Sequence, residues 1–315
     1  MKVLVTGANG FVGRAVCRCL ATEGWQVFGA VRRDVPLPEG VVARRIASIG
    51  PQTAWTEAVV GMDAVVHLAA RVHVMRELAS DPMAEFFQAN RDGALHLARS
   101  AADLGVRRFL FMSTVKVNGE ATFKTPFSEA DTPAPADPYA KSKWDAEQGL
   151  HRLAGETAMR ITILRPPLVY GPGVGGNFLT LLRAVERGWP MPFAAIDNRR
   201  SLIFVENLAD AVATALGEPA GACETFLLRD GQDVSTADLI SHLARAMGRP
   251  SRLWPVPPGL LKAAGRLFGK TAAIDRVLSS LAVDDHAFRT RFGWIPPSTL
   301  DDGLAATAAW YKDAI

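Results

Sequence analysis

Along the first half of the chain, short apolar runs alternate with stretches in which apolar residues recur every three or four positions. A short apolar run predicts a buried strand, and a longer periodic stretch predicts a helix packed on a core. Strands are expected at residues 3–5, 26–31, 41–46, 64–68, 107–113 and 161–164. Helices are expected at residues 11–20, 55–60, about 81–104 and from 138 onward. This alternation predicts an α/β fold of the Rossmann type, with a doubly wound parallel sheet.

The composition changes beyond Tyr170, where glycines, shorter helical stretches and a proline-rich run at residues 254–258 appear. We therefore expect a dinucleotide-binding domain at residues 1–170 and a smaller C-terminal lobe, mainly substrate-binding, at residues 171–315. The strand near residues 201–205 and the helix after it, together about 200–218, are expected to return to the first domain.

The first predicted strand ends in a glycine turn, Gly7-x-x-Gly10-x-x-Gly13, and the first helix follows at once. A helix N-terminus offers N–H groups and the positive end of its dipole to a pyrophosphate. Gly7 suits the turn, Gly10 lets the backbone approach the phosphates, and Gly13 lets the helix pack closely on the strand. The first gap is one residue wider than in the standard dinucleotide fingerprint, so an ordinary strand-to-helix turn stays open as an alternative.

The end of the second strand bears on the choice of dinucleotide. In nicotinamide-binding folds this place carries an acidic residue for the ribose of NAD, or a nearby arginine for the 2′-phosphate of NADP. Here Arg32 and Arg33 follow the strand, and the first carboxylate is Asp34. We therefore favour NADP(H), with Arg32 as its ligand; NAD(H) stays possible because Asp34 could turn toward the ribose.

Tyr139 and Lys143 lie four residues apart in a helix expected to begin at Pro138, with Asp137 as its N-cap. This spacing puts both side chains on one helix face. A phenol loses its proton at about pH 10. We expect the Lys143 ammonium, together with the positive ring of a bound nicotinamide, to lower the pKa of Tyr139 and make it an acid/base. Thr114, at the end of the preceding strand, is expected to hydrogen-bond the same substrate oxygen.

Two further features favour a bound cofactor. The strand at residues 64–68 runs into the small residues Ala69 and Ala70, as needed where the backbone passes close to a flat ring. Asn90 falls inside the helix expected at about 81–104, where Asn is an unfavourable residue. A hydrogen-bonding role and a solvent-facing side chain are both open for Asn90.

The overall composition excludes several classes of protein. The chain has 315 residues, 49% hydrophobic and 21% charged, which indicates a globular protein with a large core. Its net charge of +3 is too small to indicate a nucleic-acid partner. Cys17, Cys19 and Cys223 form no metal-binding pattern, so we expect reduced thiols, no metal and a cytoplasmic enzyme. No secretory signal is visible, and glycines break the longest uncharged run, so no membrane span is expected.

As a set, these residues resemble the extended short-chain dehydrogenases/reductases. The motifs that carry the resemblance extend over nearly the whole chain: Gly7-x-x-Gly10-x-x-Gly13, His67-Leu-Ala-Ala70, Asn90, Ser113-Thr114, Tyr139-x-x-x-Lys143, Arg165-Pro166 and Val169-Tyr-Gly-Pro172. The resemblance implies that Thr114, Tyr139 and Lys143 are catalytic. The cofactor contacts that it implies are Gly7, Gly10, Phe11, Val12, Gly13, Leu68, Ala69, Ala70, Asn90, Tyr139, Lys143 and Pro166.

Within that family the chain looks most like the nucleotide-sugar enzymes related to UDP-glucose 4-epimerase. Arg200 matches an arginine that pairs with the diphosphate of the substrate, a task that suits its planar guanidinium. Asn177 matches a substrate-binding asparagine, and the segment 292–304 is typical of the group. The resemblance implies a UDP-sugar substrate and a homodimer.

Three departures narrow the choice of reaction. Val115 and Lys116 stand where the dehydratases of this group carry an Asp-Glu pair, so a 4,6-dehydratase is not expected. Asn118 stands where the epimerases commonly have a tyrosine, and Arg32 where they usually have an acidic ribose ligand. The segments 70–75 and 115–120 resemble bacterial enzymes that reduce UDP-4-keto-6-deoxy-N-acetylhexosamines for surface polysaccharides.

The leading hypothesis from the sequence is an NAD(P)-dependent 4-ketoreductase of such a UDP-sugar, with Tyr139 protonating the C4 oxygen. The alternative is a UDP-hexose 4-epimerase that keeps one tightly bound NAD. A third hypothesis keeps the fold but takes a sterol or a phenolic ketone as substrate. A fourth, from another class, is a catalytically silent nucleotide-binding sensor; such proteins typically lose the tyrosine or the lysine, and this chain has both Tyr139 and Lys143.

Overall fold

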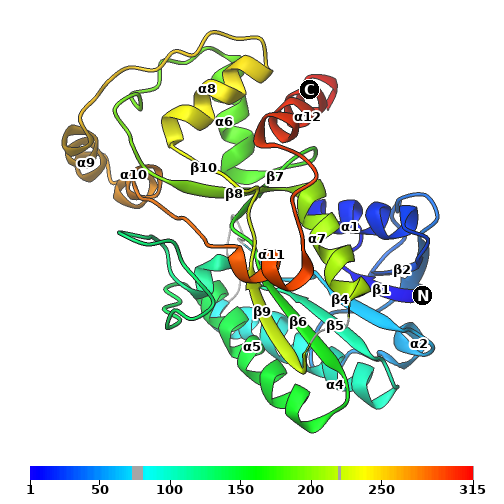
Figure 1. Ribbon diagram of the computed structural model, residues 1–315. Helices are drawn as coiled ribbons and strands as arrows, with labels where there is room; N and C mark the ends of the chain where they lie inside the picture. The colour runs from blue at the N-terminus through cyan, green and yellow to red at the C-terminus, as the bar shows by residue number, and fades with distance from the viewer. Residues whose placement is uncertain (73–80, 219–220, 315) are drawn as a thin grey trace.

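A seven-stranded parallel sheet forms the centre of the molecule (Figure 1). The computed structural model describes residues 1–72, 81–218 and 221–314. The order of the strands across the sheet is β3-β2-β1-β4-β5-β6-β9. Their bounds are β1 (Lys2–Thr6), β2 (Gln26–Val31), β3 (Val42–Arg45), β4 (Ala64–His67), β5 (Arg108–Met112), β6 (Arg160–Arg165) and β9 (Cys223–Leu227). The doubly wound α/β fold expected from the sequence is confirmed.

Helices cover both faces of this sheet, and alternate side chains of β1 pack against the helices of one face or the other. Val3 and Val5 belong to the core on the side of α1 and α7, whereas Leu4 belongs to the core on the side of α2, α4 and α5. All three side chains are fully buried, which explains why the strand reads as an unbroken apolar run. The covering helices are α1 (Phe11–Thr22), α7 (Val205–Gly217), α2 (Thr56–Val59), α4 (Gly93–Asp103) and α5 (Pro138–Glu156).

The direction of winding reverses between β1 and β4, which are adjacent in the sheet. The chain runs outward from β1 through β2 to β3, and then crosses back to β4 and continues the other way. In sheets of this kind ligands bind outside the carboxyl ends of the strands at the point of reversal. Thr6 and His67 are the last residues of the two strands and therefore mark the expected site.

A second, smaller sheet has the order β10-β8-β7, with β7 (Leu168–Tyr170), β8 (Arg200–Phe204) and β10 (Asp233–Val234). The strand near residues 201–205 is β8, which pairs with β7 and β10 and not with the strands of the seven-stranded sheet. The expected return of about residues 200–218 to the first domain stays a prediction. The following helix, α7, packs against α1. The main sheet also gains β9, which pairs with β6 and was not expected from the sequence. The division of the chain at residue 170 stays a prediction.

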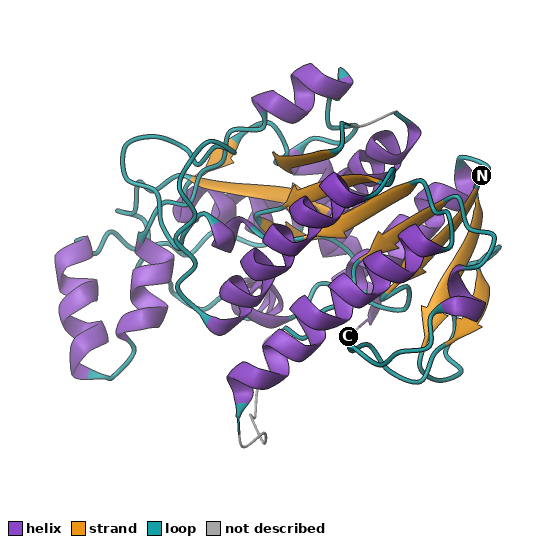
Figure 2. Ribbon diagram, turned by 90° about the horizontal axis from the view of Figure 1, so that it is seen from below, coloured by secondary structure: helices purple, strands orange, loops and turns teal. Residues whose placement is uncertain are grey.

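The helices of the C-terminal half other than α7 lie around the small sheet, except that residues 286–292 pack against β9 of the main sheet (Figure 1). They are α6 (Gly176–Glu186), α8 (Thr236–Ala246), α9 (Pro258–Leu267), α10 (Thr271–Leu278), α11 (His286–Phe292) and α12 (Leu300–Ala314). Figure 2 shows α9 and α10 as a pair of helices at the edge of the molecule. Within the described parts of the chain, no helix has the length and apolar character needed to cross a membrane.

Candidate active site

A glycine cradle joins β1 to α1 at the point where the winding reverses. Gly7 has a φ of +71°, and a Cβ on it would lie 3.0 Å from the Ala69 nitrogen. A Cβ on Gly13 would lie 2.0 Å from the Gly7 carbonyl oxygen, so no side chain fits at that position. The N–H of Gly10 donates to the same oxygen at 2.9 Å, and α1 begins at Phe11. The turn thus brings the N-terminal N–H groups of α1 to the point where the winding reverses, and such groups can bind a pyrophosphate.

Further residues expected to contact the cofactor come from three separate segments of the chain. Val12 follows Phe11 in the first turn of α1, and both are half-buried. Residues 68–70, Leu-Ala-Ala, follow β4 directly and are also half-buried. Pro166 follows β6, is buried, and accepts a hydrogen bond from the Val115 nitrogen at 3.0 Å. Their contacts with a dinucleotide stay predictions.

A buried polar bridge holds the ends of β1 and β4 together beneath the cradle. The Thr6 hydroxyl and His67 Nδ1 share a hydrogen bond of 2.8 Å, and the Ala69 nitrogen donates to Thr6 Oγ1 at 3.2 Å. Burial, and secondarily the charge of Lys143, lowers the pKa of His67 to about 3, so its imidazole is neutral. Thr6, which His67 holds in place, therefore fixes the backbone of residues 68–70. The sequence marked the position of His67 in a motif but did not indicate this role.

The end of β2 presents basic side chains and no adjacent carboxylate. Arg32 and Arg33 are exposed immediately after the strand. The carboxylate of Asp34 is 3.1 Å from Arg45 Nη1 at the end of β3, and both side chains are largely exposed. Asp34 is thus turned to an arginine of the neighbouring strand. A 2′-phosphate ligand role for Arg32 stays a prediction, as does the preference for NADP(H).

Helix α5 begins as the sequence predicted and carries Lys143 into the interior. Asp137 caps the helix by accepting a 2.7 Å hydrogen bond from the Ala140 nitrogen, and Pro138 occupies the first turn. Lys143 is 1% exposed; its Nζ donates to the Met112 carbonyl at 2.8 Å and lies 4.4 Å from the centroid of the Phe111 ring. Burial lowers the pKa of Lys143 to about 7, against the opposing effect of Glu147. Lys143 is therefore anchored at the carboxyl end of β5.

Tyr139 departs from the expected electrostatics. Burial, and after it the negative charge of Asp137, raises the pKa of the Tyr139 phenol. In the part of the chain that the structure describes, no hydrogen bond joins Tyr139 to Lys143. The expectation that Lys143 lowers the pKa of Tyr139 is thus wrong for the chain by itself, because desolvation of the phenolate and the charge of Asp137 both raise this pKa. The second charge in that expectation is the positive ring of a bound nicotinamide. This ring would have to lower the pKa of Tyr139 for the phenol to act as an acid/base.

Ser113 and Thr114 follow β5 but face different surroundings. The Ser113 hydroxyl is buried and donates to Glu147 on α5. Thr114 is half-buried, and its Oγ1 accepts a hydrogen bond of 3.3 Å from the Lys116 nitrogen, beginning a single helical turn at Val115–Val117. Ser113 is therefore held inside the structure. Thr114 is less buried than Ser113, and its predicted contact with a substrate oxygen stays a prediction.

A buried ion pair that the sequence reading missed lies behind Lys143. Glu147 and Arg165 are 0% and 4% exposed at their side chains, and Arg165 Nη2 is 2.5 Å from Glu147 Oε2. Arg165 Nη1 also donates to Asn118 Oδ1 at 3.0 Å. The pair fixes α5 against the ends of β5 and β6. The spacing Tyr139, Lys143, Glu147, each one helical turn apart, is the signal that could have indicated Glu147.

Asn90 lies in a π-helical turn, Gln88–Asp92, between α3 (Pro82–Phe87) and α4. It is fully buried, so the hydrogen-bonding role is confirmed over a solvent-facing one. Its Oδ1 accepts from the Arg71 nitrogen at 2.7 Å, and its Nδ2 donates to the Arg71 carbonyl and to Ser142 Oγ, both at 3.0 Å. These bonds join the segment after β4 to the helix that carries Tyr139. Contact of Asn90 with a cofactor stays a prediction.

The two predicted substrate residues lie in the C-terminal half. Arg200 is half-buried at the start of β8, and its Nη1 donates to the carbonyls of Arg276 at 2.8 Å and Ser279 at 3.2 Å. Asn177 is exposed in the first turn of α6. The structure does not join either residue to Thr114 or Tyr139 by a hydrogen bond. Their binding of a UDP-sugar stays a prediction.

Comparison with known proteins identifies the family. Residues 3–226 match the NAD dependent epimerase/dehydratase family. The chain belongs to that family. It is 40% identical to a UDP-glucose 4-epimerase of Vibrio cholerae over 99% of this chain and 96% of that protein. It is 27% identical to an N-acetyl-α-D-glucosaminyl-diphospho-ditrans,octacis-undecaprenol 4-epimerase of Escherichia coli O157:H7, over 97% and 94% of the two chains.

Solved structures of this NAD-dependent epimerase/dehydratase type share the fold over the full length. The UDP-glucuronic acid 4-epimerase of Bacillus cereus in complex with UDP-glucuronic acid and NAD has a TM-score of 0.80 at 22% identity, covering 100% of both chains. The UDP-glucose 4-epimerase of Thermotoga maritima with UDP-glucose has a TM-score of 0.76 at 23% identity, covering 100% and 99%. The predicted resemblance to the extended short-chain dehydrogenases/reductases is confirmed.

Proposed function

We propose that the protein is an NAD(P)-dependent oxidoreductase acting at C4 of a UDP-activated hexose. The observation that carries the proposal is the position of Lys143, whose Nζ is fixed 2.8 Å from the Met112 carbonyl at the end of β5. This anchor places the Lys143 amine one helical turn from Tyr139, at a carbonyl two residues before Thr114 in the chain. The glycine cradle lies at the same edge of the sheet. A tyrosine, a lysine and a threonine in this arrangement suit the interconversion of an alcohol and a ketone.

Each residue has a distinct task in this proposal. Tyr139 takes the proton from the C4 hydroxyl during oxidation and returns it during reduction. Thr114 orients the C4 oxygen, and Lys143 in its protonated form offers positive charge beside the phenol. When bound in the cradle of Gly7 and Gly13, the dinucleotide accepts or supplies the hydride at C4. The fit of the cradle rests on its geometry, because any Cβ at Gly13 would collide with backbone.

Substrate recognition is assigned to the C-terminal half of the chain. Arg200 would pair with the diphosphate, since the planar guanidinium can offer two parallel hydrogen bonds to phosphate oxygens. The carbonyls that bind its Nη1 hold the side chain in place. Asn177, exposed at the start of α6, would bind the same substrate.

The first candidate within this class is a UDP-hexose 4-epimerase. It is favoured by the relative from Vibrio cholerae, a UDP-glucose 4-epimerase that matches this chain at 40% identity along nearly its full length. In that reaction Tyr139 takes the proton of the C4 hydroxyl and later returns it. The hydride that leaves C4 for the bound dinucleotide would return to C4, so no external reductant is consumed. One tightly held NAD is expected.

The second candidate is reduction of a UDP-4-keto-6-deoxy-N-acetylhexosamine. It is favoured by Arg32 and Arg33 at the end of β2, with Asp34 turned to Arg45, an arrangement suited to NADPH. In this reaction Tyr139 donates one proton to the C4 oxygen per turnover.

One experiment separates the two candidates. The purified protein is incubated with UDP-glucose without added dinucleotide, and with a UDP-4-keto-6-deoxy sugar plus NADPH or NADH. Conversion of UDP-glucose to UDP-galactose supports the epimerase; oxidation of NADPH with the keto sugar supports the reductase. Neither reaction, or full activity in Tyr139→Phe, would refute the proposed chemistry. Loss of NADPH affinity but not NADH affinity in Arg32→Gln would support the predicted cofactor preference.

A further inference from the structure

The hairpin of α9 and α10 exposes large apolar side chains that do not pack in the core of the protein. Among the described residues, α9 buries only Leu261 and Gly265, and α10 buries none. Leu260, Leu267 and Phe268 are instead 62%, 80% and 72% exposed. Because large apolar residues rarely gather on a surface without a partner, this hairpin needs an explanation beyond its own packing.

Helix α9 separates its residues onto three faces. Gly265 faces α10 closely, since a Cβ on it would lie 2.9 Å from Ile274 Cγ1. Leu260 and Leu267, two turns apart, define an exposed apolar stripe that also contains the alanines at residues 263 and 264. Lys262 and Arg266, one turn apart, define a basic stripe on another side.

The charge of the hairpin is strongly one-sided. Residues 258–278 contain the cations Lys262, Arg266, Lys270 and Arg276 against the single carboxylate of Asp275, so four positive charges minus one negative charge leave +3. Within the described part of the chain, none of these cations forms an ion pair. The charges are therefore available to an anionic partner.

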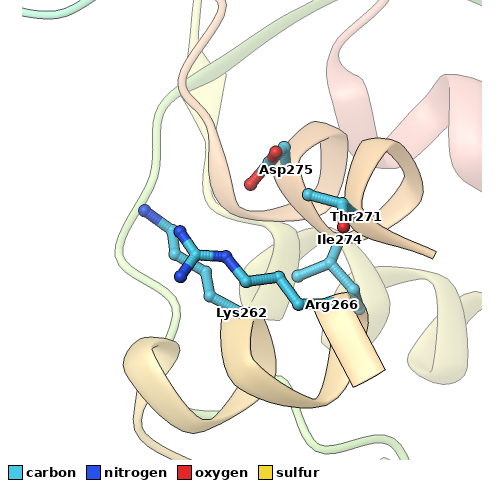
Figure 3. Close-up of a pocket in the computed structure, with 5 residues that line it drawn as sticks. All are labelled: Lys262, Arg266, Thr271, Ile274 and Asp275. Carbon is cyan, nitrogen blue, oxygen red and sulfur yellow. The ribbon is translucent and has the colours of Figure 1, made fainter. Parts of the chain in front are cut away.

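Figure 3 shows where two of the cations converge. Lys262 and Arg266 extend from successive turns of α9 to the same side, at a depression of about 100 Å³. The depression is completed by residues of α10, namely Thr271, Ile274 and Asp275. A site of this size between basic side chains suits a small anionic group, although Asp275 reduces the positive potential on its own side.

We propose that the α9–α10 hairpin docks the protein on the surface of an anionic lipid bilayer. The apolar stripe with Phe268 enters the boundary between headgroups and acyl chains, and the basic stripe binds lipid phosphates. Trp254, which is 64% exposed four residues before α9, suits the same interface. A second copy of the chain is a poor occupant, because two surfaces of net charge +3 repel each other. The hairpin lies on the membrane; it is too short to span it.

The test uses the full-length chain and does not depend on the reaction catalysed. Flotation is measured with vesicles of phosphatidylcholine alone and of phosphatidylcholine mixed with phosphatidylglycerol. Binding is expected only with phosphatidylglycerol, and it should fall at about 0.5 M NaCl, where the screening length shortens. Absence of binding to the phosphatidylglycerol vesicles would overturn the proposal without affecting the proposed enzymatic function.

Two variants with matched controls locate the surface. Lys262→Gln/Arg266→Gln is expected to lower the partition coefficient roughly 30-fold, at about fivefold per basic residue. Leu267→Ser/Phe268→Ser should lower it by on the order of tenfold or more. The controls are Arg152→Gln on α5 and Val60→Ser at the end of α2, both exposed, which should bind as the wild type does.

The outcomes divide as follows. Loss of binding in the hairpin variants alone, with unchanged thermal unfolding, supports the proposal. Equal binding of hairpin and control variants assigns the interaction to another surface and overturns it. A change from dimer to monomer in Leu267→Ser/Phe268→Ser, without any vesicle binding by the wild type, assigns the hairpin to a second copy and also overturns it.

Discussion

Lys116 Nζ lies 2.6 Å from Asp137 Oδ2 and so connects the turn after β5 to the N-terminus of α5. The backbone of Lys116 also donates to Thr114 Oγ1, and the other oxygen of Asp137 accepts from the first turn of α5. One residue therefore joins the segments that carry Thr114 and Tyr139. The positive charge of Lys116 also lies beside the carboxylate of Asp137, and this carboxylate raises the pKa of Tyr139.

We predict that Lys116→Met raises the pKa of Tyr139 further, because the charge of Asp137 is then uncompensated. Oxidation at C4 requires Tyr139 to lose its proton, so the rise of kcat with pH should move to higher pH and kcat at neutral pH should fall roughly tenfold for each pKa unit. Asp137→Asn, which keeps a capping side chain, should move the profile to lower pH. Lys116→Arg should resemble the wild type; a pH profile unchanged in Lys116→Met would contradict the prediction.

Lys143 gives a prediction about stability. Its pKa is lowered from 10.5 to about 7 by burial, so between these values the unfolded chain binds a proton that the folded chain does not. The free energy of unfolding should therefore rise with pH in this window, by about 1.4 kcal/mol per pH unit from this group, and stay level below it. The raised pKa of Tyr139 acts only above the ordinary value for tyrosine, about 10, and does not interfere.

The check is urea unfolding of protein freed of dinucleotide at about pH 7.5 and about pH 9. Lys143→Met removes the titrating group but keeps the volume of the side chain, so its stability should lack this rise. The difference between the two proteins is the quantity of interest, because other groups titrate equally in both. Equal slopes would show that Lys143 is not desolvated as the structure indicates.

The sequence predicted most of the strands and helices because these elements depend largely on the local periodicity of apolar residues. It did not predict which strands pair when they are far apart in the chain. The strand at β8 was placed correctly, but nothing in its own residues tells whether it joins β1's sheet or pairs with β7. Residues 223–227, Cys-Glu-Thr-Phe-Leu, alternate weakly and are buried only at their end, so β9 had no strong apolar pattern to reveal it.

In the candidate site, too, local spacing was predictable, whereas properties set by tertiary contacts were not. Tyr139 and Lys143 share a helix, so their common face followed from spacing alone. The pKa of Tyr139 depends on burial and on the carboxylate of Asp137, which no spacing rule evaluates. The pair of Glu147 and Arg165 was missed because its partners come from a helix and a strand, and only the tertiary structure removes both from water.

That buried pair should be sensitive to loss of one partner. Glu147→Gln leaves the guanidinium of Arg165 buried without a counter-charge, at an expected cost of about 3–5 kcal/mol in the free energy of unfolding. Glu147→Met/Arg165→Met should recover a large part of this loss. The exposed pair of Arg99 and Glu156 is the control, where Glu156→Gln should cost less than about 1 kcal/mol. Equal losses in the two single variants, measured by urea unfolding, would contradict the structural role of Glu147.

The glycine cradle gives the sharpest steric prediction. Gly13→Ala places a methyl group 2.0 Å from the Gly7 carbonyl oxygen, so either the turn or α1 must move. Since the cradle depends on the closeness of these two segments, dinucleotide affinity should fall by on the order of tenfold or more. Gly155→Ala is the matched control: this residue lies in α5 with nothing within 4 Å of the added Cβ, and alanine should stabilise the helix by up to about 1 kcal/mol. Fluorescence titration with NADH and NADPH measures the affinity, and circular dichroism checks that both variants are folded. A folded Gly13→Ala protein that binds dinucleotide as tightly as Gly155→Ala would mean that the pyrophosphate does not rest on this turn.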